Sequence, residues 1–144
     1  MASIREQILD YIVDQLNLVN GVDAVRSRFV PVRREEGIRV IVTPEEETAE
    51  EMVSLGVRRE LTIKTSIIAR GTIPDQVADA VAVKVYAKLK GTNLVASMGG
   101  LAYTPIVETG RSFQFEDADD GAIDYQILWT VDYVTDYTSE ETQP

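Results

Sequence analysis

The sequence predicts an α+β fold with two layers, in which a mainly antiparallel sheet of about five strands carries two helices on one face. Two stretches repeat apolar residues every three to four positions, and the stretches around them alternate apolar and polar residues. Successive strands follow one another through short connections, which favours antiparallel neighbours. The 144 residues, 44% of them hydrophobic, suffice for one core. We therefore expect a single domain over residues 1–138 and a polar tail over residues 139–144.

The first predicted element is an amphipathic helix over residues 3–18. Ser3 and Glu6 have the spacing of a capping box, and Asn20 with Gly21 ends the helix. The apolar residues that recur at helical intervals are Ile4, Ile8, Leu9, Ile12, Val13 and Leu16.

Two strands that pair as a hairpin are predicted next. Residues 24–30 alternate, with Arg26 and Arg28 on the outer side, and residues 38–43 form a short β-branched strand that ends at Pro44. Residues 44–58 then form an acidic excursion, an exposed loop or a loosely held helix, because its carboxylates repel one another. These carboxylates are Glu45, Glu46, Glu47, Glu50 and Glu51.

The remaining elements are a strand, a helix and two strands. Residues 58–70 alternate as an antiparallel strand with one solvated face does. Thr72 to Asp75 is a second capping signal, and Pro74 suits the first turn of a helix over residues 74–90. A glycine-punctuated connection leads to a strand near residues 106–115, an acidic turn, and one long closing strand from Asp124.

The closing strand holds the only tryptophan, and its alternation predicts where the strand is buried. One face, beneath the helices, carries Tyr125, Ile127, Trp129, Val131 and Tyr133. Beyond it, Val134, Asp136 and Tyr137 extend past what two short helices can cover, so we expect this end to contact a neighbouring subunit. Replacing Trp129 with alanine should then damage folding, whereas removing Tyr137 onward should spare the fold and weaken assembly.

Composition argues against several functional classes. The sequence has no cysteine and no histidine, which removes disulfides, thiolate sites and the commonest general base, so we expect no enzyme, no cofactor and no metal. Asp117, Asp119, Asp120 and Asp124 could hold calcium, but their spacing does not fit an EF-hand, and a solvated turn is the favoured interpretation. A net charge of −10 opposes binding to nucleic acid, and neither a leader nor a membrane span is expected.

The charges are unevenly distributed along the chain. Arginines concentrate early, at Arg26, Arg28, Arg33, Arg34 and Arg39, while three acidic segments, residues 45–51, 116–120 and 132–141, hold 13 of the 24 carboxylates. If the basic region of one copy meets an acidic segment of the next, the contact is heterologous and can close into a ring. Unrelated surface charges on a monomer are an equally good interpretation of the charge alone.

The whole pattern resembles the phage tail terminator (tail completion) family of small ring-forming proteins. The resemblance covers about residues 3–138 and includes the N-terminal helix. The other segments that carry it are "AVRSRFVPVRR", "IRVIVTPEEE", "RELTIKTSIIAR", "PDQVADAVAVKVYAKL" and "RSFQFEDADDGAIDYQILWTVDYVTDYT".

The resemblance implies a virion protein without catalytic activity that assembles in the host cytoplasm. It would form a hexameric ring at the head-tail junction that caps the tail tube, stops its polymerisation and joins it to connector or neck proteins. DNA would pass through the centre without specific binding. A contractile and a non-contractile tail both use such rings. The alternatives are another neck or head-tail adaptor protein, and a non-viral module in which the sheet's aromatic residues line a small-molecule pocket.

The candidate contacts with another subunit or with the tail tube come from the arginine-rich region, the acidic excursion and the end of the closing strand. They are Arg26, Arg28, Arg33, Arg34, Glu45, Glu46, Glu47, Glu50, Glu51, Asp136 and Tyr137.

Overall fold

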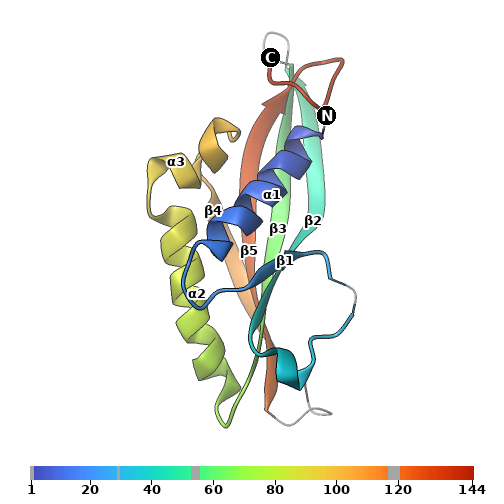
Figure 1. Cartoon of the computed structure of the whole chain (residues 1–144). Coiled ribbons are helices and arrows are strands. Elements are labelled where there is room, and N and C mark those ends of the chain that lie inside the picture. Colours follow the sequence, from blue (N-terminus) through green and yellow to red (C-terminus); the bar gives the residue numbers. More distant parts are fainter. Residues whose placement is uncertain (1, 29, 53–55, 117–120) are drawn as a thin grey trace.

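Two long helices lie against one face of a five-stranded sheet in a computed structural model of the chain (Figure 1), which describes residues 2–28, 30–52, 56–116 and 121–144. The elements are α1 Ile4–Asn17, β1 Ala24–Arg26, η1 Arg34–Glu36, β2 Arg39–Met52, β3 Gly56–Arg70, α2 Pro74–Lys90, α3 Asn93–Ala96, η2 Met98–Gly100, β4 Val107–Glu116 and β5 Ala122–Thr135. The strand order is β1-β2-β3-β5-β4. The α+β prediction is confirmed, but the sheet is mixed because β1 runs parallel to β2.

The core lies between the helices and the face of the sheet that alternation predicted. Trp129 is fully buried, and its indole Nε1 donates a hydrogen bond of 3.1 Å to Thr65 Oγ1 on the neighbouring β3. Each large apolar side chain buried here contributes about 1.5–3 kcal/mol. The residues of β3 and β5 that share this face are Leu61, Ile63, Thr65, Ile67, Tyr125, Ile127, Trp129, Val131 and Tyr133.

The helix boundaries agree closely with the prediction, and one of the two predicted caps forms. The Ser3 hydroxyl accepts a hydrogen bond of 3.1 Å from the Glu6 amide at the start of α1. The capping signal at Thr72 is wrong: the N-cap of α2 is Ile73, which makes no side-chain cap, and Pro74 alone marks the first turn. No helix in the described part of the chain is long and apolar enough to cross a membrane.

The predicted hairpin of the first two strands is wrong. β1 has only three residues and pairs in parallel with Val40, Ile41 and Val42 of β2. Two parallel strands need a connection that carries the chain back to its starting side. The connection after Arg26, which includes η1, provides this return, so β1 and β2 are neighbours without forming a hairpin.

The acidic excursion predicted at residues 44–58 is also wrong where the structure describes it, because residues 44–52 and 56–58 extend the sheet; residues 53–55 lie outside the described residues. β2 continues through Pro44 with an irregularity before Glu46, and it pairs with β3 as far as Met52 opposite Gly56. Beyond Val42 no described strand pairs with the outer side of β2, and an edge strand tolerates proline. Basic residues of β3 offset the acidic charges: Lys64 lies 3.0 Å from Glu45, and Arg59 lies 3.4 Å from Glu47.

The chain termini meet at one end of the sheet (Figure 1). The Ile4 amide donates to the Glu140 carbonyl at 2.9 Å, and the Asp136 amide donates to the Thr142 carbonyl at 2.9 Å. Residues 139–144 therefore pack back on the domain, and Val134, predicted to reach a neighbour, is buried by its own chain. The predicted acidic turn at residues 117–120 lies outside the described residues.

The glycine-punctuated connection contains the short helices α3 and η2, which periodicity did not predict. The Thr92 hydroxyl accepts a hydrogen bond of 3.2 Å from the Val95 amide and so caps α3.

Candidate functional site

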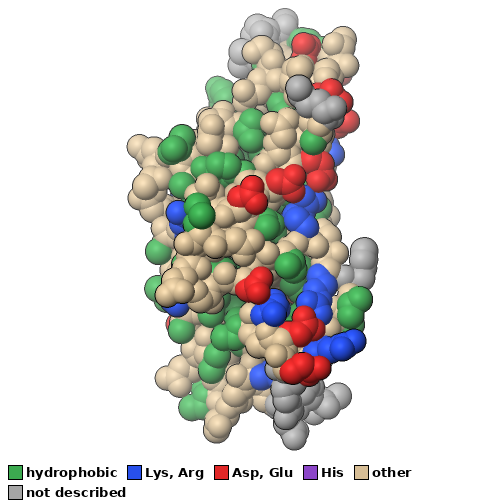
Figure 2. Space-filling view, in the orientation of Figure 1, with side chains coloured by type: hydrophobic (Ala, Val, Ile, Leu, Met, Phe, Trp, Pro, Cys, Tyr) green, Lys and Arg blue, Asp and Glu red, His purple; other side chains and the backbone are tan. Residues whose placement is uncertain are grey.

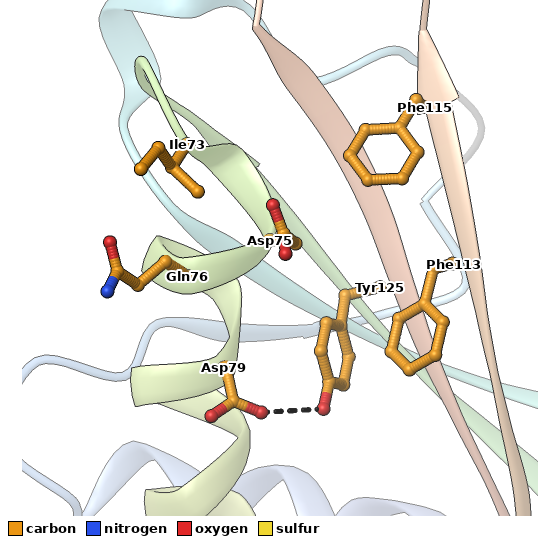
Figure 3. Close-up of a pocket in the computed structure, with 7 residues that line it drawn as sticks. All are labelled: Ile73, Asp75, Gln76, Asp79, Phe113, Phe115 and Tyr125. Carbon is orange, nitrogen blue, oxygen red and sulfur yellow. Dashed lines mark hydrogen bonds between the residues drawn. The ribbon is translucent and has the colours of Figure 1, made fainter.

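A hollow of about 560 Å³ opens between the beginning of α2 and the edge strand β4 (Figure 3). We call it the α2–β4 hollow. Its walls combine large apolar side chains with carboxylates, and it is not covered by any described part of the chain. The residues that line it are Ile73, Asp75, Gln76, Asp79, Phe113, Phe115 and Tyr125.

The large apolar side chains at the rim of this hollow are about half exposed to solvent. Ile73 is 54% exposed, Phe113 53% and Phe115 58%. Phe113 and Phe115 alternate along β4 on the side of the sheet that faces α2 (Figure 3), where Phe113 packs edge-on against Tyr125 with ring centroids 4.8 Å apart. β4 is the last strand of the described sheet, so no described strand lies beside these rings on its outer side. Grouped exposure of this kind marks a contact surface.

A polar network reaches the hollow through Tyr125 and Asp79. The Tyr125 hydroxyl donates a hydrogen bond of 2.9 Å to Asp79 Oδ1 and accepts one of 2.8 Å from Arg111 Nη1. Arg111 also holds Glu108 through two hydrogen bonds of 2.9 and 3.0 Å. Burial raises the pKa of the Tyr125 phenol, so this group stays a neutral donor. The Arg111 hydrogen bonds lower the pKa of the Glu108 carboxyl, so Glu108 stays ionised.

Asp75 differs from Asp79 because it makes no side-chain hydrogen bond or ion pair with any described residue, and it is exposed at the rim. A carboxylate beside exposed aromatic and aliphatic groups favours a ligand that is apolar in part and cationic in part. Within the described residues, no three or more acidic side chains come together as a metal site would require.

The predicted arginine contacts are mostly paired within the chain. Arg26 Nη1 lies 3.1 Å from Glu6 and 2.9 Å from Asp10 of α1. Arg28 pairs with Glu36 at 2.6 Å. Arg33 is exposed, and the side chain of Arg34 lies outside the described part.

The predicted acidic contacts divide into residues that pair with basic side chains and residues that are exposed. Glu47 forms a polar cluster with Arg5 and Tyr133. It lies 2.8 Å from Arg5 and accepts a hydrogen bond from the Tyr133 hydroxyl. Glu46, Glu50 and Glu51 are exposed along β2.

At the far end of β5, Asp136 is exposed and Tyr137 is 49% exposed. None of the residues predicted as contacts lines the α2–β4 hollow. The sequence contains a signal for it, the alternating phenylalanines of "RSFQFE", but alternation alone does not show that the strand lies at the edge of the sheet.

Charged and exposed hydrophobic side chains gather on different sides of the molecule. In Figure 2, hydrophobic side chains gather on the side of α2 and α3, while acidic and basic side chains lie together on the side of α1 and β1. The exposed apolar residues of α2 and α3 include Val83, Tyr86 and Leu94.

Comparison with solved structures finds chains of similar fold, one of which is described here. A chain of the structure described as "Virion of native gene transfer agent (GTA) particle" aligns with 90% of this chain and 92% of its own length, at 19% sequence identity and a TM-score of 0.45. No protein-family model matches the sequence. No curated protein matches it.

Proposed function

We propose that this chain is a structural subunit of a phage-like virion, and that its hexameric ring caps the tail tube, stops tube polymerisation and joins the tail to the head. The resemblance to tail terminators over about residues 3–138 is the basis of this proposal. The observation that supports it in the structure is the exposed apolar edge formed by β4 and α2. An unpaired edge strand with two exposed phenylalanines is a liability in a monomer and is ordinarily covered.

The opposite edges of the sheet differ, which suits assembly into a ring. One edge is β4 with its apolar rim, and the other is formed by β1 and the acidic part of β2. Contact between two different surfaces is heterologous, and repeated heterologous contacts close into a ring when the rotation permits.

The charge of the chain supports a passage for DNA. The net charge is −10, and Glu46, Glu50 and Glu51 are exposed on β2. Carboxylates that face the hole of a ring would repel phosphate and leave no attractive site along the path. In this proposal the partners of the chain are further copies, the tail tube protein, and connector or neck proteins. The proposed function needs no enzyme activity and no cofactor.

Electron microscopy of tube assembly tests this function. The tail tube protein of the same particle would be polymerised with and without the purified chain. We expect shorter tubes with a ring at one end when the chain is present. Tubes of unchanged length without a terminal ring would contradict the proposal, and binding to the portal or connector alone would favour a neck adaptor.

A small-molecule binding module is the second candidate, and the α2–β4 hollow is the observation that favours it. Its volume of about 560 Å³ lies within the range of ligand sites. A metabolite that binds the folded chain would raise its melting temperature, and this rise should be absent in Phe113→Ser.

A further inference from the structure

A short exposed segment of the chain has the chemistry that the α2–β4 hollow lacks. In the connection between β1 and β2, Val30 is 60% exposed, Pro31 is exposed, and Arg33 is exposed. The Arg33 side chain forms no hydrogen bond or ion pair with the described residues. This 30–33 segment therefore offers two apolar groups and one cation, whereas the hollow offers apolar side chains and the carboxylate of Asp75.

The backbone of the 30–33 segment is held in place by two arginines from outside the segment. Arg28 donates to the Val30 carbonyl at 2.8 Å and to the Pro31 carbonyl at 3.1 Å, and Arg70 donates to the Val32 carbonyl at 2.7 Å. Glu36, which pairs with Arg28, also accepts a hydrogen bond of 2.9 Å from the Arg33 amide. A segment fixed in this way loses little conformational entropy when it binds. Arg28, predicted to be a contact itself, thus positions its neighbours.

The hollow and the segment lie on different sides of the sheet. The hollow opens at the β4 edge on the face that carries the helices, whereas Val30 and Pro31 line a second hollow with Ile41, Ile68 and Asp124, which alternate with core residues and so face the other way. The registers place Phe113 of β4 opposite Tyr125, Tyr125 opposite Ile67, Ile67 opposite Val40, and Val40 opposite Ala24 of β1. This row runs from the rim of the hollow to β1, where the connection containing the segment begins. Figure 1 shows the two regions on opposite sides of the molecule, α2 on the left and the connection on the right.

We propose that the α2–β4 hollow of one subunit receives the 30–33 segment of the next copy. Val30 and Pro31 pack against Ile73, Phe113 and Phe115, and Arg33 pairs with Asp75. Because the two surfaces differ and do not overlap, each copy can bind two neighbours at once, and such heterologous contacts close into a ring when the rotation permits. This inference rests on the proposed function and names the contact between its subunits.

Charge reversal with rescue tests the contact. Arg33→Glu places like charges together, and so does Asp75→Arg, whereas the double variant restores an opposite pair at every contact. We expect each single variant to raise the protein concentration of half-assembly by about tenfold or more, and the double variant to restore most of the loss. Sedimentation velocity measures assembly, and circular dichroism checks that each variant is folded.

A second set of variants tests the apolar part. Val30→Asp should weaken assembly, whereas Leu18→Asp should not, because Leu18 is 70% exposed and lines neither the hollow nor the segment. Tyr137→Ser tests the contact that the sequence predicted at the other end of β5 and should also leave assembly unchanged.

The outcomes separate this contact from the proposed function. Rings that form equally well in the charge-reversal variants would overturn the contact and leave the proposed function intact, as would a double variant no better than the single ones. A wild-type chain that stays monomeric at every concentration would overturn both. Normal rings in Arg33→Glu that no longer cap tubes would show that the hollow or segment binds the tube, which also overturns the contact between copies.

Discussion

Replacing Glu47 with glutamine tests the polar cluster that ties the extended β2 to the rest of the domain. The carboxylate of Glu47 accepts hydrogen bonds from Arg5 at 2.8 and 3.2 Å and one from Tyr133, and its side chain is 14% exposed. Hydrogen bonds to charged groups contribute about 1.5–3 kcal/mol each, and glutamine keeps the shape and one accepting oxygen. We therefore expect the free energy of unfolding to fall by about 2 kcal/mol. At roughly 2–4 °C per kcal/mol, the melting temperature should fall by about 6 °C.

The same substitution has a defined pH dependence. Burial raises the pKa of the Glu47 carboxyl, but the hydrogen bonds from Arg5 and Tyr133 and the charges of Arg5 and Arg59 lower it more, so its pKa lies below the ordinary value. Such a group stabilises the fold above its unfolded pKa of about 4.3, and the contribution is lost as the pH falls through the folded pKa. The stability difference between wild type and Glu47→Gln should thus be full near neutral pH and shrink in acid.

Urea unfolding at several pH values measures this difference, and the neighbouring residue supplies the control. Glu46 is exposed on the same strand and forms no side-chain hydrogen bond or ion pair with the described residues, so Glu46→Gln should change the unfolding free energy by less than about 0.5 kcal/mol. Equal losses in the two variants, or a Glu47→Gln loss that does not depend on pH, would refute the role assigned to the cluster.

Three further substitutions follow from the packing. Trp129→Ala should cost about 3–5 kcal/mol in urea unfolding, because it empties a fully buried site, and a loss below about 1 kcal/mol would contradict that burial. Deleting residues 139–144 removes two backbone hydrogen bonds, those of Ile4 and Asp136. The free energy of unfolding should therefore fall by about 2 kcal/mol, and an unchanged urea midpoint would refute this. Gly56→Ala should lower the melting temperature, because Gly56 has a φ of +109° and a Cβ there would collide with the Thr135 carbonyl; unchanged melting would contradict the tight approach.

The sequence predicted well those elements in which the spacing of apolar residues matches the residues that are buried. The helix α2 was predicted with the bounds Pro74–Lys90, and the alternation of β5 identified its buried face. In each case one residue in two, or one in three to four, meets the core, so local spacing carries the information.

The errors arose where partners distant in the sequence decide the structure. Repulsion among glutamates predicted a loop at residues 44–58, but Lys64, Arg59 and Arg5 offset those charges from other elements. The parallel pairing of β1 depends on the path of its connection to β2, which local spacing does not specify.

The candidate site could be predicted only in part. "RSFQFE" showed two phenylalanines on one face of a strand. Their exposure depends on β4 being the last strand and on α2 beginning beside it, and both follow from the strand order of the whole sheet. Arg28, which the sequence predicts as a contact, also donates hydrogen bonds to the carbonyls of Val30 and Pro31, and local spacing does not reveal these partners.

Native mass spectrometry of the purified chain over a concentration series tests the central claim most directly, because a ring-forming subunit must associate into an assembly of fixed size. We expect a monomer that gives way to a single closed hexamer, with negative-stain images that show a central hole. A monomer at every concentration, or open assemblies that keep growing, would contradict a ring that terminates a tail tube.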